Sequence, residues 1–464
     1  MKHFSLLVTF AMAVLAASCS GTQMAPSATP LAPPVTQIPT QFATPTLIPP
    51  SPAARGTPTA IATLSPAANV VVTPTSVSLA APKLKIDCIS ILPQNAPRLT
   101  SKGVVVLGRS GPADASLDMS TGVLRDFAQP IYRTVNFVSS SDGAKLAYDQ
   151  LTLDKPGGQI ISEALVIAGA DGRPEKLIPW QWGLSNIVGW LNNDQLIINI
   201  AAKDPDENRS AKPATLVSLD TKTGQQRTLR PNFPNIDLDY PTADWNGWGE
   251  TVYDPNLQRV IYSANDFSYG RARFVLWNLQ TQTTLANLPT RDVYWVQPAW
   301  SPDGKLFAVQ TNPDKGNDWW SFELYGGGRD ATQFQQWTHL TEYYSKVMIQ
   351  SFTWSPDSRH IAFWFVPNPQ GELTIEQGQM QLGILDVTTG EVAITCIPGD
   401  DAFSSSSPDL APPLWSPDSQ QLLVEDRFTN NAGQILLVDL SQHIAEKVAD
   451  NMGPAVWLTG SSSK

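Results

Sequence analysis

The tetrapeptide Trp-Ser-Pro-Asp begins at residues 300, 354 and 415, and each copy continues with Gly or Ser and then an apolar run. A motif that recurs about every 50–60 residues indicates a repeat architecture. Pro sets the first central position of a tight turn, Asp bonds its own backbone, and Gly or Ser tolerates the last position. The strand after each turn, such as residues 306–309, is apolar at nearly every position, so we expect other sheets to cover both of its faces.

Weaker copies of the motif occupy residues 139–143, 190–194 and 253–256. A second pair of strands around another turn follows most copies, at residues 169–172, 220–224, 278–281, 386–390 and 439–441; the copy at residue 300 is less regular and contains three glycines at 326–328. Four strands in each copy of about 40–60 residues form one blade of a β-propeller.

The two ends of the repeat region complement each other. Residues 454–457 resemble a first strand with its Trp, whereas residues 103–107 form an apolar strand with no partner before it. Pairing them completes a blade and removes an exposed sheet edge. The predicted fold is therefore all-β: one propeller, with seven four-stranded blades closed by the C-terminal strand. Six or eight blades are the alternatives.

These repeats resemble those of the TolB-like, or WD40-like, propeller family, in which Trp-Ser-Pro-Asp-Gly precedes an apolar strand. The resemblance covers roughly residues 100–459 and implies a propeller fold. It implies no single function, because related propellers include protein-interaction modules, substrate-filtering domains of prolyl-oligopeptidase-like peptidases and stand-alone exported proteins. No Gly-x-Ser-x-Gly motif is present, which argues against a peptidase.

Residues 1–18 have the pattern of an export signal. Residues 15–19, Leu-Ala-Ala-Ser-Cys, resemble the lipobox of bacterial lipoproteins, which implies that Cys19 carries lipid and anchors the protein in the bacterial cell envelope, outside the cytoplasm. The alternative is an ordinary cleaved signal with an incidental Cys19. Residues 19–82 are rich in Pro, Thr and Ala and indicate a disordered linker. Residues 83–464 form the predicted propeller domain.

The formal net charge of -11 argues against a nucleic acid partner, because phosphate backbones attract basic surfaces. We expect a monomer that contacts the membrane only through its lipid anchor.

Within each blade the Ser-Pro-Asp-Gly turn and the second turn should lie on one side of the ring, and the longer connections on the other. Trp and Tyr, which form binding hot spots, are frequent in those longer connections. The candidate ligand-binding residues are Trp180, Trp182, Trp245, Trp248, Trp295, Trp319 and Trp320, accompanied by Tyr294, Tyr343 and Tyr344. The alternative is that these aromatic side chains pack between blades or fill the central channel.

Acidic residues cluster in the same connections, at Asp204, Asp206 and Glu207, at Asp237, Asp239 and Asp244, and at Asp400 and Asp401. Carboxylates suit Ca²⁺, but none of these clusters has the spacing of a known calcium loop. The three histidines after the signal, His339, His360 and His443, share no motif. We therefore predict no cofactor, no metal site and no catalytic residue, with structural calcium as the alternative.

Cys88 and Cys396 are the only cysteines after Cys19, and exported proteins form disulfides. We predict that the two are bonded, with two buried free thiols as the alternative. Cys88 lies in the N-terminal segment 84–92, and Cys396 lies on the outer strand of the blade that begins at Trp354. The order of the repeats does not make these two elements immediate neighbours.

Together these features predict a non-enzymatic module that binds a peptide, a protein or a glycan. One alternative is an exported carbohydrate-active enzyme that uses acidic residues on the side of the long connections. The other is a structural component of an envelope complex.

Overall fold

The computed structural model describes residues 83–460, except residues 95–97, 109–114, 130, 141, 181–184, 202–213, 231–250, 267–270, 282, 289–297, 312–321, 369–378, 400–411, 429–431 and 451. The predicted signal, Cys19 and the predicted linker lie outside the described residues.

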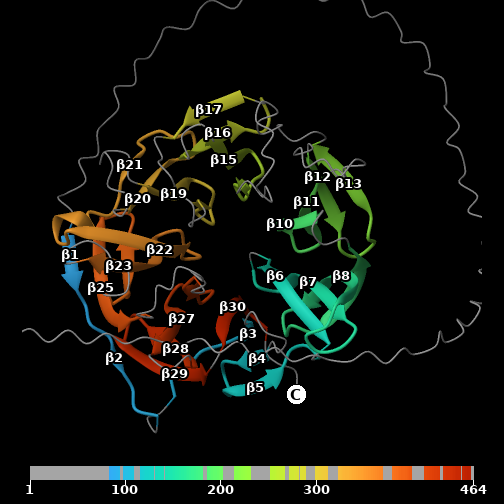
Figure 1. Ribbon diagram of the computed structural model, residues 1–464, viewed down its shortest axis with the longest axis horizontal. Helices are drawn as coiled ribbons and strands as arrows, with labels where there is room; N and C mark the ends of the chain where they lie inside the picture. Colours follow the sequence, from blue (N-terminus) through green and yellow to red (C-terminus); the bar gives the residue numbers. More distant parts are fainter. Residues whose placement is uncertain are drawn as a thin grey trace, which may run out of the picture. The chain divides into compact units, whose positions relative to one another are not determined.

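Seven sheets, each with four antiparallel strands from the repeats, form the seven blades of a β-propeller, as the motif spacing predicts (Figure 1). Blade 1 contains β30 (Gly453–Leu458), β3 (Val104–Gly108), β4 (Ala115–Asp118) and β5 (Val123–Asp126). Blade 2 contains β6 (Tyr132–Ser139), β7 (Lys145–Leu153), β8 (Ile160–Gly169) and β9 (Pro174–Pro179). Blade 3 contains β10 (Ser185–Asn192), β11 (Gln195–Ala201), β12 (Ala214–Asp220) and β13 (Gln226–Arg230).

The remaining blades follow in chain order. Blade 4 contains β14 (Thr251–Tyr253), β15 (Arg259–Asp266), β16 (Arg271–Asn278) and β17 (Thr283–Asn287). Blade 5 contains β18 (Ala299–Trp300), β19 (Leu306–Thr311), β20 (Glu323–Gly328) and β21 (Gln335–Gln336). Blade 6 contains β22 (Lys346–Trp354), β23 (His360–Asn368), β24 (Gln381–Asp386) and β25 (Glu391–Pro398), and blade 7 contains β26 (Leu414–Trp415), β27 (Gln421–Phe428), β28 (Ala432–Asp439) and β29 (Ile444–Asp450).

The C-terminal strand closes the ring. β30 pairs antiparallel with β3, with Trp457 opposite Val105, and so becomes the first strand of blade 1. The predicted closure is confirmed.

The hydrophobic core lies between neighbouring blades, and successive residues of one strand face opposite neighbours. Leu422 and Val424 of β27 pack with side chains of blade 6, whereas Leu423 between them packs with side chains of blade 1. All three are completely buried. This alternation explains why the strand after each motif turn is apolar without interruption.

An N-terminal strap, residues 83–92, adds a fifth strand to each of two blades. β1 (Lys83–Ile86) pairs parallel with β25 of blade 6, and β2 (Ser90–Ile91) pairs parallel with β29 of blade 7 (Figure 1). Backbone hydrogen bonds continue between the two strands, from Asp87 N–H to the carbonyl of Ile394 at 2.9 Å. The expectation that the N-terminal segment and the outer strand of blade 6 are not neighbours is therefore wrong, because the strap crosses the outer edge of that blade.

Candidate functional site

The motif turns share one hydrogen-bond pattern. In blade 5 the hydroxyl of Ser301 donates to Oδ1 of Asp303 at 2.7 Å and accepts the backbone N–H of Leu306 at 3.0 Å. Blades 2, 6 and 7 repeat the pattern at Ser140, Ser355 and Ser416. The Ser and Asp of the motif are thus used within their own turns.

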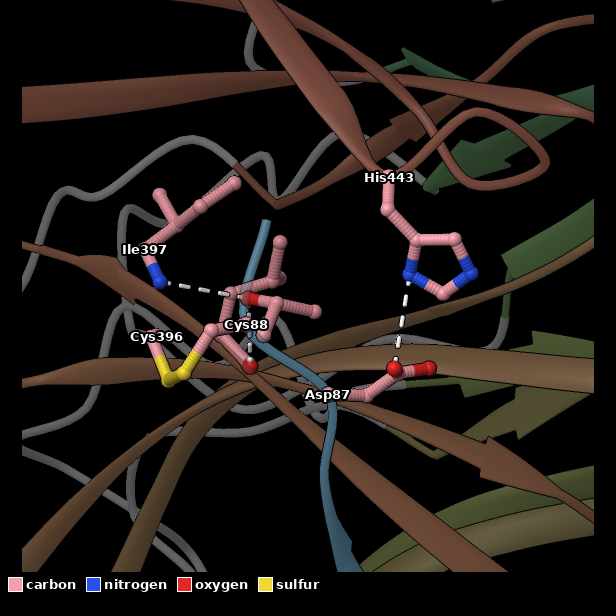
Figure 2. The surroundings of a disulfide bond; sticks show 7 residues. Asp87, Cys88, Cys396, Ile397 and His443 are labelled. Atoms are coloured by element: carbon pink, nitrogen blue, oxygen red, sulfur yellow. Dashed lines mark hydrogen bonds and ion pairs between the residues drawn. A yellow bond between two sulfur atoms is a disulfide. The ribbon is translucent and has the colours of Figure 1, made fainter. Parts of the chain in front are cut away.

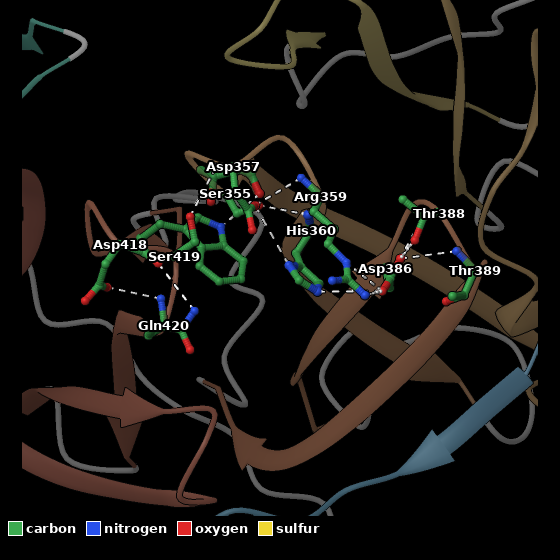
Figure 3. Close-up of polar contacts among 12 residues, drawn as sticks. Ser355, Asp357, Arg359, His360, Asp386, Thr388, Thr389, Asp418, Ser419 and Gln420 are labelled. Carbon is green, nitrogen blue, oxygen red and sulfur yellow. Dashed lines mark hydrogen bonds and ion pairs between the residues drawn. The ribbon is translucent and has the colours of Figure 1, made fainter.

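The last position of the turn connects neighbouring blades. Ser358 and Ser419, at the turn position where the sequence has Gly or Ser, have φ angles of 60° and 61°, in the left-handed region that favours glycine. The Ser358 hydroxyl accepts the backbone N–H of Asp303 in blade 5 at 3.1 Å. Ser419 accepts that of Asp357 in blade 6 at 3.1 Å (Figure 3).

The second turns of the blades lie on the same side of the ring as the motif turns, because ion pairs and hydrogen bonds join the two sets. We call this side the motif-turn face. Contacts between blades on it include Thr459 Oγ1 to the carbonyl of Asp142 at 2.9 Å, Lys176 Nζ to the carbonyl of Lys222 at 2.7 Å, and Arg259 with Asp330 at 2.7 Å.

The motif tryptophans also connect blades. The indole N–H of Trp354 donates to the carbonyl of Ala299, the residue before Trp300 in the preceding blade, at 3.2 Å. Trp190, Trp300 and Trp415 make the equivalent bond to Val138, Val252 and Thr353 at 2.9, 3.1 and 3.3 Å. Sequence analysis placed these tryptophans at strand ends but did not predict this bond.

His360 lies among the polar residues of the motif-turn face in blade 6 (Figure 3). Its Nε2 is 3.8 Å from Oδ2 of Asp386, and its ring stacks on Trp415 with the ring centroids 6.1 Å apart. Hydrogen bonds from Arg359 and Thr388 help to hold the pKa of Asp386 below its usual value despite partial burial. The nearby Ser355 is completely buried and held by its turn, so this group is an ion-pair cluster and offers no nucleophile.

The opposite side, which we call the loop face, is where the first strand of each blade begins and its second strand ends. Among the candidate ligand-binding residues, Trp182, Trp245, Trp248, Trp295, Trp319 and Trp320 lie outside the described residues, as does Tyr294. The connections that carry these residues start and end on the loop face. For example, β13 runs away from the motif-turn face, and β14 runs back toward it.

Trp180 is the one candidate tryptophan that the structure describes. It follows the end of β9 on the loop face, is half-buried, and packs against the core between blades 2 and 3. Burial raises the pKa of Asp149, on β7 of the same blade, to about 6, and the indole N–H of Trp180 acts in the opposite direction. Since Asp149 is completely buried, it is not placed to exchange a proton with a ligand.

A second described segment of the loop face precedes β22. The short 3-10 helix η1 (Leu340–Glu342) is held by the buried Glu323, whose Oε1 accepts the backbone N–H of Thr341 at 2.7 Å. Tyr343 follows and is 52% exposed, whereas Tyr344 packs on Phe365. Tyr343 is thus the most accessible aromatic side chain on the described part of this face.

Cys88 and Cys396 are joined by a disulfide (Figure 2). Cys88 belongs to the strap and Cys396 to β25, so the bond fixes the strap on blade 6. Beside it, Asp87 Oδ1 lies 3.4 Å from Nδ1 of His443 in the last turn of blade 7. The strap is therefore held to two blades.

The acidic clusters at residues 204–207, 237–244 and 400–401 lie outside the described residues. Among the residues that are described, no three His, Cys, Asp or Glu side chains converge as metal ligands would. Within the same part of the chain, no helix has the length and apolarity needed to span a bilayer.

No known protein family matches the chain, and none of the curated proteins matches its sequence. Solved structures are similar in fold. A TolB protein from Acinetobacter baumannii is 15% identical with a TM-score of 0.38, over 78% of this chain and 68% of that one. An oligogalacturonate lyase from Vibrio parahaemolyticus is 12% identical with a TM-score of 0.44, over 75% and 86%. A prolyl endopeptidase is 10% identical with a TM-score of 0.48, over 76% of this chain and 50% of the endopeptidase.

TolB proteins are thus among the structures similar to this chain, as the motif resemblance implied. Identities this low concern the propeller fold alone, and proteins with different names share it.

Proposed function

We propose that this protein is a lipid-anchored, extracytoplasmic β-propeller that binds a peptide, a protein or a glycan without catalysing a reaction on it. The ligand is held on the loop face by aromatic side chains of the long connections. The motif-turn face keeps the blades together.

One observation carries the proposal: the Ser, Asp and Trp residues of the repeat motif form hydrogen bonds within the scaffold, on the motif-turn face. The motif Ser and Asp bond within their turns, and the motif Trp bonds the preceding blade. These bonds make the motif-turn face a rigid scaffold, and the connections on the loop face are free to vary in sequence. Binding residues are usually found on such loops. The exposed Tyr343 on a segment fixed by Glu323 is an example of such a presentation.

Two features support a location outside the cytoplasm. The Cys88–Cys396 disulfide suits an oxidising compartment. Residues 1–19 have the pattern of an export signal ending in a lipobox, followed by a Pro-rich linker that would carry the propeller away from the membrane.

The test is a glycan and peptide array screen with the full chain carrying Cys19→Ser, which removes the acylation site. The double variants Trp245→Ala/Trp248→Ala and Trp319→Ala/Trp320→Ala are screened in parallel, with Lys222→Ala on the motif-turn face as the control. We expect at least one double variant to lose binding at an unchanged Tm, while Lys222→Ala binds like wild type. Binding that survives both double variants would contradict the placement on the loop face. An absence of any binding would favour the envelope-scaffold alternative.

A further inference from the structure

Blade 2 has an irregular inner strand. The register of β6 on β7 shifts between Val135 and Val138, so Asn136 and Phe137 form a bulge. Asn136 has a φ of 57°, which few residues other than Gly adopt, although Asn is enriched among them. The bulge points the Asn136 side chain at β7, where its Nδ2 donates to Oδ2 of Asp149 at 2.7 Å. A bulge that re-aims a side chain is often tied to function.

Asp149 is an unusual residue for this position. It lies in the middle of β7, opposite Leu165, and is completely buried. Its second oxygen, Oδ1, is also buried and has no hydrogen-bond partner of normal geometry among the described residues. A buried carboxylate oxygen without a hydrogen bond is unfavourable, so a donor on the same side of the blade would stabilise the charged form.

Trp180 is a donor that the strand register brings to this side of the blade. Asp149 lies opposite Leu165, and Leu165 lies opposite Ile178, so these three side chains share one face of the blade. Trp180 follows Ile178 by two residues and therefore lies on the same face. The indole Nε1 of Trp180 is buried and, like Oδ1 of Asp149, does not meet the geometry of a normal hydrogen bond. Two buried polar groups, a donor and an acceptor, thus lie on one face of the blade within two strands of each other, and the indole N–H acts to lower the pKa of the carboxyl.

We propose that Asp149 is a positioning residue that orients the indole of Trp180 on the loop face and makes this orientation depend on pH. The proposal rests on the proposed function, because Trp180 belongs to the candidate binding surface. An N–H group interacts more strongly with a carboxylate than with a neutral carboxyl group. The charged form of Asp149 therefore holds the indole, and protonation releases it.

Few charged groups share the face of Asp149: on β6 the charged residue is Arg133, which lies opposite Leu151. Glu163 on β8, which lies on the same face, adds repulsion that favours the protonated form, and Asn136 on β6 favours the charged form. The described side chains that blade 3 packs against this seam are apolar or aromatic: Ile187, Trp190, Leu196, Ile198, Ile200, Val217 and Leu219. Lys145 and Lys176, the basic residues of β7 and β9, are engaged on the motif-turn face with Glu175 and with the carbonyls of Thr221 and Lys222. Among the described residues, Glu163 is thus the one other titratable group that acts on Asp149.

The test is NMR of the tryptophan indole N–H groups in the full chain carrying Cys19→Ser, with Trp180→Phe identifying the Trp180 resonance. We expect this resonance to shift with a midpoint near pH 6, the value to which burial raises the pKa of Asp149. The shift should vanish in Asp149→Asn. The indoles of Trp300 and Trp354 serve as internal controls, because they donate to backbone carbonyls and should not titrate.

A second variant tests the direction. Asn136→Gly accepts the positive φ but removes the Nδ2 donor that favours the carboxylate, so the midpoint should move to higher pH. A Trp180 resonance that is flat between pH 5 and 8 in wild type, or a shift that persists in Asp149→Asn, would overturn the proposal. No ligand is added, so a failed array screen leaves this test unaffected.

Discussion

Single turn positions show how the ring is held together. Gly304 and Ser358 occupy the same position of successive motif turns and have φ angles of 67° and 60°. A Cβ on Gly304 would lie 2.9 Å from Asn256 Nδ2 and 3.3 Å from Cδ of Pro255 in blade 4, so a side chain at this position would require the Asn256 amide to shift. Ser358 has room, and its hydroxyl bonds blade 5. The choice between Gly and Ser therefore follows from the neighbouring turn.

The positive φ of Ser358 predicts that Ala and Gly at this position affect the stability of the fold differently. Ser358→Ala keeps the positive φ and loses the hydrogen bond from Asp303, so we expect it to destabilise the fold by about 1 kcal/mol. Ser358→Gly loses the same bond but removes the backbone strain of about 1 kcal/mol, so its stability should stay near that of wild type. Denaturant unfolding measures both. If the Gly variant is as destabilised as the Ala variant, backbone strain is not a factor here.

Asp149 predicts a pH-dependent stability. Its pKa is about 6 in the folded chain against an ordinary 3.8, so the folded state binds the proton more tightly than the unfolded state. Stability from this group is therefore lost as pH rises from about 4 to 6 and is absent at neutral pH. Asp149→Asn should be more stable than wild type at pH 8 by about 1–2 kcal/mol and lose this advantage near pH 4. A stability difference that does not change with pH would contradict this reading.

At the scale of elements, the strap is the part that sequence patterns did not position. β1 and β2 are only four and two residues long, and each pairs in parallel with a strand more than 300 residues away, as Lys83 does with Glu391 and Ser90 with Ile444. Such short edge strands carry no periodicity that identifies a partner. The Cys88–Cys396 pair could be proposed from composition, but its structural basis, the strap crossing blade 6, could not.

The disulfide closes a sequence separation of 308 residues. Chain-entropy arguments assign such a link up to about 5 kcal/mol, although measured values are often smaller. We expect Cys88→Ser/Cys396→Ser to lower Tm, because the strap would then be held by backbone pairing, by the packing of Leu84 and Ile89 and by the Asp87–His443 contact, without a covalent link. Wild type in reducing agent should match the double variant. Equal Tm values for oxidised wild type and the double variant would show that the link does not stabilise the fold.

At the scale of the whole molecule, the repeat motif was sufficient to predict the architecture. Trp-Ser-Pro-Asp turns mark the start of blades, the second turns mark their outer hairpins, and the unpaired strands at the two ends predict the closure by β30. The candidate site was less predictable. The Asn136–Asp149–Trp180 group depends on a bulge and on pairing across four strands. No local sequence pattern predicts the bulge or this pairing. The Glu323 network behind Tyr343 was missed for the same reason.

The central claim is that the two faces of the ring have separate tasks. The most direct test measures Tm and array binding together for one substitution on each face. Trp354→Phe removes the indole bond to Ala299 and should lower Tm while the remaining folded protein still binds. Trp319→Ala/Trp320→Ala should do the reverse, losing binding at an unchanged Tm. If Trp354→Phe abolishes binding at an unchanged Tm, or if the loop-face variant loses stability and keeps binding, the division between the two faces is wrong.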